Sequence, residues 1–329
     1  MKMMEIGLYT FADVAPGQHP GARLRNLVEE IVLADQVELD VFGVGEHHRP
    51  DYAVSAPAVA LAAAATQTRR IRLSSAVTVL SSDDPIRVHQ QFATLDGLST
   101  GRAEIMAGRG SFIESFPLFG YDLADYDRLL AEKLGKLLGL RAGAVPGVHP
   151  IPVQQPIPLC IAVGGTPQSV VRAASLGLPM ALAIIGGDPA RFVPFFDLYR
   201  DAWAKAGRKP GEARLSLNMH GFVAATIADA KAIFEGPHQE VMNRIGRERV
   251  WPPQSHAHFE ASCGPDGHLL IGGAEEMAAK ILDLHRAFGF DRILIQMAIG
   301  AMPHASVLKA IEILGTEVAP RVRSAISGS

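Results

Sequence analysis

Short apolar runs bounded by turn residues alternate with longer amphipathic stretches along almost the whole chain, and this alternation restricts the possible folds most. Several runs are apolar on successive residues, which is typical of strands in a parallel sheet buried on both faces. The runs that predict strands are residues 5–9, 41–44, 71–79, 103–107, 158–163, 180–185, 215–223 and 292–297. The stretches that predict helices are residues 24–37, 56–66, 87–98, 128–140, 168–176, 189–206, 228–245, 275–288 and 305–316.

Eight strands separated by helices predict an α/β protein with a (β/α)8 (TIM) barrel as a single domain over residues 1–329. An open doubly wound sheet fits the periodicity nearly as well. Two stretches interrupt the alternation. Residues 141–158 carry five prolines and predict an extended connection. Residues 246–272, with two consecutive prolines and three histidines, predict a long loop or lid.

Charge and cysteine content argue against several classes of protein. The formal net charge is −3 over 329 residues, so no basic surface for nucleic acid is indicated. The N-terminal segment has too short an apolar run for a signal peptide or a membrane span. Cys160 lies in an apolar run, and with Cys263 as the second cysteine a disulfide framework is not expected. We expect a soluble, cytoplasmic protein that binds neither nucleic acid nor membrane.

The first cluster that can carry chemistry is Gly43-Val44-Gly45-Glu46-His47-His48, directly after the second predicted strand. In a barrel this is the carboxyl end of a strand, where catalytic groups concentrate. Adjacent histidines in an extended chain point in different directions, so one can face the barrel mouth while the other packs beneath it. An imidazole there can move a proton at neutral pH. The other interpretation is that both histidines only bond neighbouring loops.

Two further clusters are rich in glycine. Gly108-Arg109-Gly110-Ser111-Phe112 follows the fourth predicted strand, where glycines let the backbone approach a flat or anionic ligand and a guanidinium pairs with phosphate. A glycine turn with a surface arginine explains this segment almost as well.

Gly164-Gly165-Thr166-Pro167-Gln168-Ser169 joins the fifth predicted strand to a helix. Thr166 suits the N-cap and Pro167 the first turn, and free backbone N–H groups with the helix dipole favour an anion. An ordinary capped helix start would leave the two glycines unused. The segment is neither a Walker A loop nor a G-x-G-x-x-G fingerprint. His256, His258, Cys263 and His268 match no standard zinc spacing, so no metal is expected.

These clusters, in this order, resemble the bacterial luciferase-like flavin-dependent monooxygenases. The resemblance rests on FGVGEHH at 42–48, RIRLSSAVTVL at 70–80, LDGLSTGRAEIMAGRG at 95–110, VGGTPQSVVRAASLGLPM at 163–180 and GTEVAP at 315–320. It implies a (β/α)8 barrel that binds FMN at the carboxyl ends of its strands. It further implies a two-component system, in which a separate NAD(P)H:flavin reductase supplies reduced FMN and the enzyme uses O2 to oxygenate a small organic substrate.

The resemblance also implies roles for individual residues. His47, with His48 beside it, matches a histidine needed for catalysis. Ala76 and Val77 match a pair joined by a non-prolyl cis peptide beneath the flavin, and Gly108 lies near the ring. The implied phosphate contacts are Arg109 together with Gly164, Gly165, Thr166 and Ser169. Members of the family commonly pair through helices two and three, so the alanine-rich stretch from Ala56 to Ala65 is expected in a homodimer interface.

Two features of the sequence depart from the family pattern, and two alternative functions stay open. Residues 141–158 look shorter than in related proteins, and an arginine that contacts phosphate in the family aligns near Asp127, with Arg128 one place off. The alternatives are an oxidoreductase of the same barrel that uses a deazaflavin for hydride transfer, and a non-catalytic flavin-binding partner subunit. The sequence does not identify the substrate.

Overall fold

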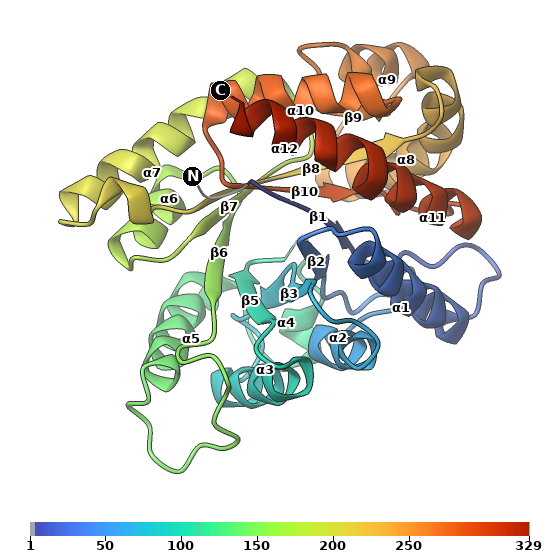
Figure 1. Cartoon of the computed structure of the whole chain (residues 1–329). Coiled ribbons are helices and arrows are strands. Elements are labelled where there is room, and N and C mark those ends of the chain that lie inside the picture. Colours follow the sequence, from blue (N-terminus) through green and yellow to red (C-terminus); the bar gives the residue numbers. More distant parts are fainter. Residues whose placement is uncertain (1–3, 111, 329) are drawn as a thin grey trace.

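Eight strand positions close on themselves into a parallel barrel. The computed structural model describes residues 4–110 and 112–328. In barrel order the strands are β1 (Glu5–Thr10), β2 (Val41–Val44), β3 (Arg72–Ser75) continued by β4 (Thr78–Val79), β5 (Ala103–Gly108), β6 (Leu159–Val163), β7 (Met180–Ile184), β8 (Leu215–Val223) and β10 (Arg292–Gln296). β10 pairs with both β8 and β1, which closes the ring (Figure 1). The predicted barrel is confirmed, and the open sheet is excluded.

Helices surround the strands (Figure 1). They are α1 (Pro20–Gln36), α2 (Pro57–Ala65), α3 (Pro85–Ser99), α4 (Ser115–Leu118), α5 (Tyr126–Arg141), α6 (Pro167–Ser175), α7 (Val193–Lys205), α8 (Ile227–Arg249), α9 (His256–Cys263), α10 (Ala274–Phe288), α11 (His304–Ile313) and α12 (Ala319–Ser327). Several begin with proline, whose fixed φ and missing N–H suit the first turn. Among the described residues, no helix has both the length and the apolar character needed to cross a membrane.

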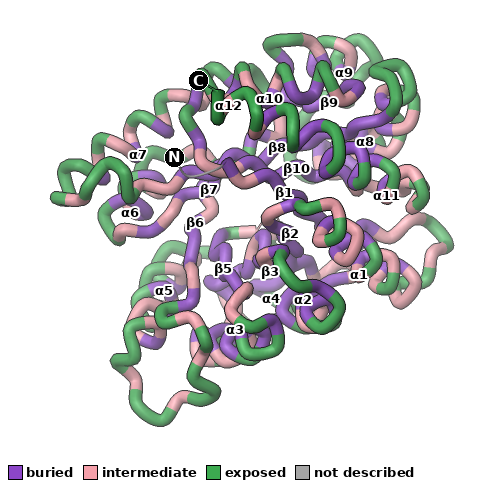
Figure 2. The backbone as a smooth tube through the Cα atoms, viewed as in Figure 1, coloured by how far each residue is buried: buried purple, intermediate pink, exposed green. Residues whose placement is uncertain are grey.

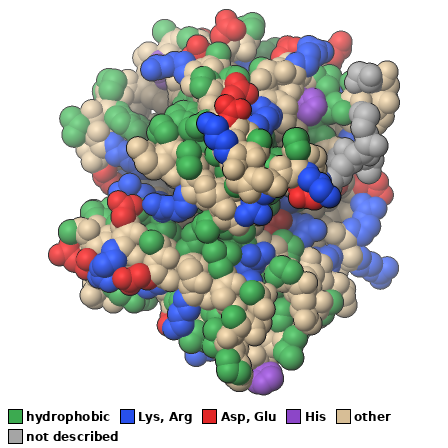
Figure 3. Space-filling model, turned by 90° about the vertical axis from the view of Figure 1, so that its left-hand side faces the viewer, with side chains coloured by type: hydrophobic (Ala, Val, Ile, Leu, Met, Phe, Trp, Pro, Cys, Tyr) green, Lys and Arg blue, Asp and Glu red, His purple; other side chains and the backbone are tan. Residues whose placement is uncertain are grey.

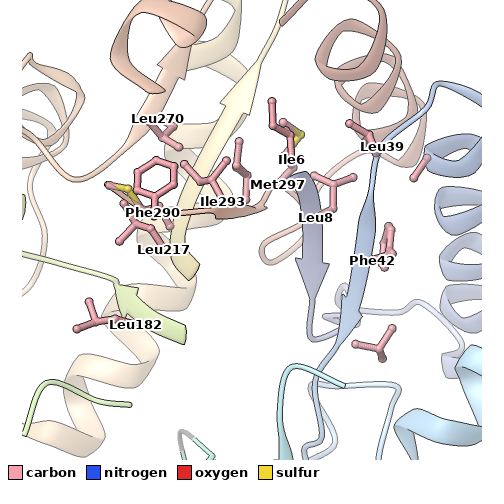
Figure 4. Packing of buried hydrophobic residues seen from close by; sticks show 14 of the residues in the cluster. Ile6, Leu8, Leu39, Phe42, Leu182, Leu217, Leu270, Phe290, Ile293 and Met297 are labelled. Carbon is pink, nitrogen blue, oxygen red and sulfur yellow. The ribbon is translucent and has the colours of Figure 1, made fainter. Parts of the chain in front are cut away.

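The main core lies between the barrel and its helices. Side chains on the outer face of the strands, such as Leu8, Phe42, Leu217 and Ile293, are almost completely buried against the helices (Figure 4). The outer helix surfaces are exposed, whereas the strands are buried nearly throughout (Figure 2). This explains why the strand runs are apolar on both faces.

Inside the barrel, the side chains form layers of different character. A second apolar cluster fills the middle of the bore, formed by Tyr9, Val41, Ala76, Met106, Cys160, Ala181 and Leu294. Each of these residues is at most 5% exposed. Charged side chains of Glu5, Glu104 and Arg292 lie at the amino end of the same strands. At the carboxyl ends of β2, β5, β6 and β7 the inward positions are small, with Gly43, Gly108, Ala162 and Ala183.

Two segments differ from their predicted form, and a third keeps it. Residues 71–79, predicted as one strand, form β3 and β4, with a cis peptide between Ala76 and Val77. Residues 246–272, predicted as a loop or lid, hold the end of α8, the helix α9 and the strand β9 (Leu270–Gly272), which pairs with β8. The proline-rich connection has no helix or strand from 142 to 158, in agreement with its prediction.

Candidate active site

The ten predicted site residues lie at the carboxyl ends of four consecutive barrel strands. They are His47 and His48 after β2, Ala76 and Val77 between β3 and β4, Gly108 and Arg109 at β5, and Gly164, Gly165, Thr166 and Ser169 after β6. Because β2, β3, β5 and β6 are parallel neighbours, their carboxyl ends form one continuous part of the barrel rim. The structure therefore brings these segments together, although they are up to 122 residues apart (His47 to Ser169).

His47 presents one free ring nitrogen inside an aromatic enclosure. The residue is 4% exposed, and its Nδ1 lies 3.8 Å from Oε1 of Glu114. Its Nε2 is buried and has no hydrogen-bond partner among the described residues. The rings of Phe11, Tyr52 and Phe112 lie 4.6, 4.3 and 5.0 Å from the imidazole. A buried polar atom without a partner is costly, so this nitrogen is prepared to bond a ligand.

Glu114 is held in its ionised form beside His47. Burial raises the pKa of its carboxyl, but the neighbouring His47 ring and the backbone N–H of His48 outweigh that effect, and the pKa lies below its usual value. The N–H of His48 donates to Oε1 of Glu114 at 3.4 Å. An anionic carboxylate near Nδ1 favours the proton on that nitrogen, which leaves Nε2 as the acceptor.

His48 is fixed in a different direction. Its Nε2 lies 2.9 Å from Oε1 of Glu46, and this bond to a buried carboxylate raises the pKa of the imidazole. The second oxygen of Glu46 accepts from the backbone N–H of Val79 at 2.9 Å, which ties the end of β2 to β4. The ring of His48 is thus bonded to a neighbouring side chain, as expected if the histidines only bond nearby loops. Nε2 of His47, in contrast, has no partner among the described residues.

The carboxyl end of the bore is lined by small side chains. A Cβ added to Gly108 would meet Val77 Cγ1 and Ala162 Cβ at 3.0 Å each, so these three neighbours form a close-packed floor. A Cβ at Gly43 would meet Ala76 Cβ at 2.7 Å. Ala183 is exposed although it lies in the middle of β7, on the same strand face as the inward Ala181. The mouth is therefore open above a flat floor, which suits a planar ligand.

The segment before α6 forms an open helix N-terminus. Gly165 has a φ of +85°, which favours glycine, and Thr166 is the N-cap but makes no side-chain bond to the helix backbone. Instead, Thr166 Oγ1 donates to Ser169 Oγ, which donates to the Thr166 carbonyl, each at 2.8 Å. Among the described residues, the N–H groups of Gly165 and Thr166 have no acceptor. Such a terminus accommodates a phosphate.

Two arginines contribute positive charge near this rim. The guanidinium of Arg109 lies 4.5 Å from the ring centroid of Tyr126. Burial raises the pKa of the Tyr126 phenol, and the charges of Arg109 and Arg172 oppose that shift, so both lie near this ring. Arg128 is instead paired with Asp125 and Glu132 on the surface. Ser111, part of the predicted cluster, lies outside the described residues.

The C-terminal part of α8 reaches the rim from the other side of the barrel. Arg49 pairs with Glu248 through both Nη groups, at 2.7 and 2.9 Å. Arg244 Nε lies 3.1 Å from Oδ2 of Asp51, and a Cβ at Gly300 would meet the carbonyl of Pro237 at 2.8 Å. These contacts fix α8 beside the loop that carries His47.

Comparison with known proteins decides the family. Residues 4–292 match the model of the luciferase-like monooxygenases. The chain belongs to this family. It is accordingly an oxidoreductase of the luciferase-like type, and the proposed resemblance is confirmed.

Individual relatives are distant but extend over nearly the full chain. The 4-hydroxyprotoasukamycin monooxygenase of Streptomyces nodosus subsp. asukaensis is 26% identical over 95% of this chain and 90% of its own length. The crystal structure of a monooxygenase from Streptomyces bottropensis matches with a TM-score of 0.84 at 24% identity, covering 96% of this chain and 99% of that one.

Two further structures with the same fold carry different cofactors in their descriptions. The oxygenating constituent of 3,6-diketocamphane monooxygenase from Pseudomonas putida, in complex with FMN, matches at a TM-score of 0.80 with 18% identity, covering 97% of this chain and 98% of that one. A coenzyme F420-dependent tetrahydromethanopterin reductase from Methanopyrus kandleri matches at 0.71 with 17% identity, covering 98% and 100%. At these identities the likeness shows the shared fold.

Sequence reasoning missed several residues of this luciferase-like site. Glu114, Tyr52 and Phe11 surround His47 but belong to loops with no motif of their own. Arg172 follows Ser169 by three residues on α6, a helical spacing that would have indicated a shared face. Within the described ranges, no group of three or more His, Cys, Asp or Glu side chains could hold a metal ion.

Proposed function

We propose that this enzyme is an FMN-dependent monooxygenase of the two-component type. It takes reduced FMN from a separate NAD(P)H:flavin reductase and uses O2 to oxygenate a small organic substrate. One observation carries the proposal: four neighbouring strand ends place an unpaired imidazole nitrogen, a floor of small residues and an open helix N-terminus on the same rim.

The residues on this rim fit the parts of FMN. The N–H groups of Gly165 and Thr166 are unpartnered donors, and with Ser169 and Arg109 they would hold the phosphate. Val77, Gly108 and Ala162 form the floor on which a planar ring would lie, next to the Ala76–Val77 peptide. When bound, reduced FMN supplies the electrons that activate O2, which is the difficult chemistry of the reaction.

The protein's own groups would orient the reactants and handle a proton. His47 Nε2 accepts or donates a proton at the mouth, while Glu114 keeps the proton on Nδ1 and fixes the ring orientation. The rings of Phe11, Tyr52 and Phe112 exclude water around this nitrogen. An apolar enclosure of this kind suits a substrate with an apolar body.

We also propose a homodimer formed through α2, in the cytoplasm. The stretch from Ala56 to Ala65 is almost entirely small and apolar, and Val59 on it is 66% exposed. Small side chains let two helices approach closely, and an exposed valine on such a surface is buried when a second copy packs there.

The test is a binding titration followed by coupled turnover. The purified protein is titrated with FMN, reduced FMN and a deazaflavin, and oxygen consumption is then followed with NADH and a flavin reductase. Tight binding of reduced FMN, with substrate-dependent oxygen uptake that His47→Gln abolishes, supports the proposal. Selective binding of the deazaflavin favours the hydride-transfer alternative. Flavin binding with turnover unaffected by His47→Gln contradicts the role given to His47, and flavin binding without any turnover favours the partner-subunit alternative.

A further inference from the structure

A cavity of about 290 Å³ lies at the amino end of the barrel, opposite the candidate active site. Its lining comes from the starts of β1, β3, β5, β6, β7, β8 and β10, so it is centred on the barrel bore. The buried apolar layer through Tyr9, Met106 and Leu294 separates it from the mouth. Figure 3 looks at the molecule from the left of Figure 1, the side on which β8 and β10 begin, and shows Lys and Arg side chains around a shallow hollow.

The carboxylates in this cavity are already engaged. Arg292 donates to both oxygens of Glu104, at 2.6 and 3.0 Å, and to Glu5 at 2.6 Å. Asp291 accepts from the backbone N–H of Leu215 at 2.9 Å. TIM-barrel interiors are usually filled by branched apolar side chains, so a charged layer here is unusual. The Arg292 network accounts for part of the lining but not for the remaining arginines.

Three more arginines line the cavity and keep donor capacity. Arg72 Nη1 is buried and has no hydrogen-bond partner among the described residues, and its Nε is 3.7 Å from Glu104. Arg141 donates from Nε to the carbonyl of Ile157 at 2.7 Å. Arg214 donates to two backbone carbonyls and lies 3.7 Å from Asp291. The lining thus holds four arginines and three carboxylates, an excess of positive charge with an unsatisfied buried donor.

Part of the remaining lining is apolar. Pro158 and Pro179 are half-buried there, and the small side chains of Cys160 and Ser216 leave the space open. An inorganic anion would leave these prolines without a contact, whereas a carboxylate on a short alkyl chain would contact both the arginines and the prolines. We propose that the amino-end cavity binds a small organic anion, with its carboxylate at Arg72 and Arg141 and its apolar body against Pro158 and Pro179.

The proposal is tested by isothermal titration and by thermal shift of the full-length protein with hexanoate. Hexanamide serves as the neutral analogue and inorganic phosphate as the anion without an apolar body. The variants are Arg72→Gln and Arg141→Gln, two independent changes in case one of them fails to fold. Arg87→Gln, at an exposed position on α3 outside the cavity, is the matched control, and His47→Gln reports on the other end of the barrel.

The expected result is one hexanoate per chain, with affinity reduced about tenfold or more by Arg72→Gln or Arg141→Gln, since a hydrogen bond to a charged group contributes about 1.5–3 kcal/mol. Arg87→Gln and His47→Gln leave the affinity unchanged. Equal binding of hexanamide, tighter binding of phosphate, retention of affinity in both cavity variants, or no saturable binding of hexanoate would each overturn the proposal. Because a buried apolar layer separates this cavity from the candidate active site, failure here leaves the flavin proposal standing, and the reverse also holds.

Discussion

The carboxylate of Glu114 lies 3.8 Å from Nδ1 of His47, while Nε2 on the far side of the same ring is buried without a partner. The two ring nitrogens therefore differ, because Nδ1 lies near an anion and Nε2 is buried in an aromatic enclosure. Glu114 follows β5 and His47 follows β2, so this relationship depends on β2 and β5 lying on either side of β3.

Replacing Glu114 by Gln tests this relationship directly. Without the anionic charge, the proton loses its preference for Nδ1, and turnover should fall by roughly tenfold to hundredfold, within the range that a positioned acid–base group contributes. Nitrogen-15 NMR of the imidazole of the protein alone reports the tautomer, and flavin titration reports binding, which should not change. Glu132→Gln on the exposed surface is the control. An unchanged tautomer in Glu114→Gln would show that Glu114 does not position the ring.

The proposed phosphate site at Arg109 and the N-terminus of α6 predicts a difference between FMN and riboflavin, which has no phosphate. Arg109→Gln should weaken FMN binding by about tenfold or more and leave riboflavin binding unchanged, because only the phosphate meets the guanidinium. Fluorescence titration of both flavins measures this. Arg128→Gln, whose arginine is paired on the surface, should leave both affinities as they are. Equal losses of affinity for FMN and riboflavin would show that Arg109 does not contact the phosphate.

The open mouth predicts that a large side chain at Ala183 blocks the cofactor. Ala183 is exposed on an inward-facing strand position, so Ala183→Phe should fill the mouth at little cost in stability. We expect a loss of at least tenfold in FMN affinity with a thermal midpoint close to that of the wild type. Ala204→Phe, at an exposed position on α7 outside the proposed dimer interface, is the control and should bind normally. Normal FMN binding by Ala183→Phe would mean that the ring lies elsewhere.

Buried histidines predict a loss of stability in acid. Burial, and then the charge of neighbouring histidines, lowers the pKa of His238 to about 3, and burial lowers that of His268 to about 4, from 6.5. Unfolded chains take up these protons near pH 6.5, so stability is full above that pH and falls as the pH drops toward 4 and then 3. Each histidine contributes a slope of up to about 1.4 kcal/mol per pH unit in that range.

Urea denaturation at pH 7.5, 5.5 and 4.5 measures this slope. His238→Phe should reduce it, because the imidazole stacks on Phe234 at 5.1 Å and Phe keeps that contact without a titrating group. His149→Gln, at an exposed position, should keep the wild-type slope. An unchanged slope in His238→Phe would show that protonation of His238 does not cause the loss of stability in acid.

The proposed dimer interface predicts a change in oligomeric state. Val59→Asp places a charge on the exposed face of α2, so it should convert a dimer into a monomer without unfolding the chain. Light scattering after size-exclusion chromatography measures the mass, and circular dichroism checks the fold. Glu132→Gln, at an exposed position on α5, should leave the mass unchanged. A wild-type monomer, or a dimer that survives Val59→Asp, would contradict the interface.

Much of the barrel is predictable from the sequence because each strand is a local apolar run. The helix α9 was missed because its eight residues show almost no apolar periodicity, and β9 because three residues are too few to stand out. The last helix, α12, follows a π-helical turn at Leu314–Val318 that carries the chain past the predicted end.

The site residues also fall into two groups, those with a local sequence motif and those that only the fold brings together. The motif around His47 is local, and its place at a strand end follows from the fold, so the sequence could predict it. Glu114 is separated from His47 by 67 positions (114 minus 47), and its contact depends on how the loops after β2 and β5 meet. The same holds for Arg49 with Glu248, which are 199 residues apart in the sequence and meet only in the folded barrel.

The buried layer through Tyr9, Met106, Cys160 and Leu294 makes the bore a blind tube. Anything that reaches the mouth must leave by the same opening, past the loop of His47 and the end of α8. Two different molecules therefore cannot arrive from opposite ends, and a bound cofactor, once seated on the floor, leaves later arrivals only the space above it. We therefore expect a molecule that rests on this floor to leave before another can take its place there.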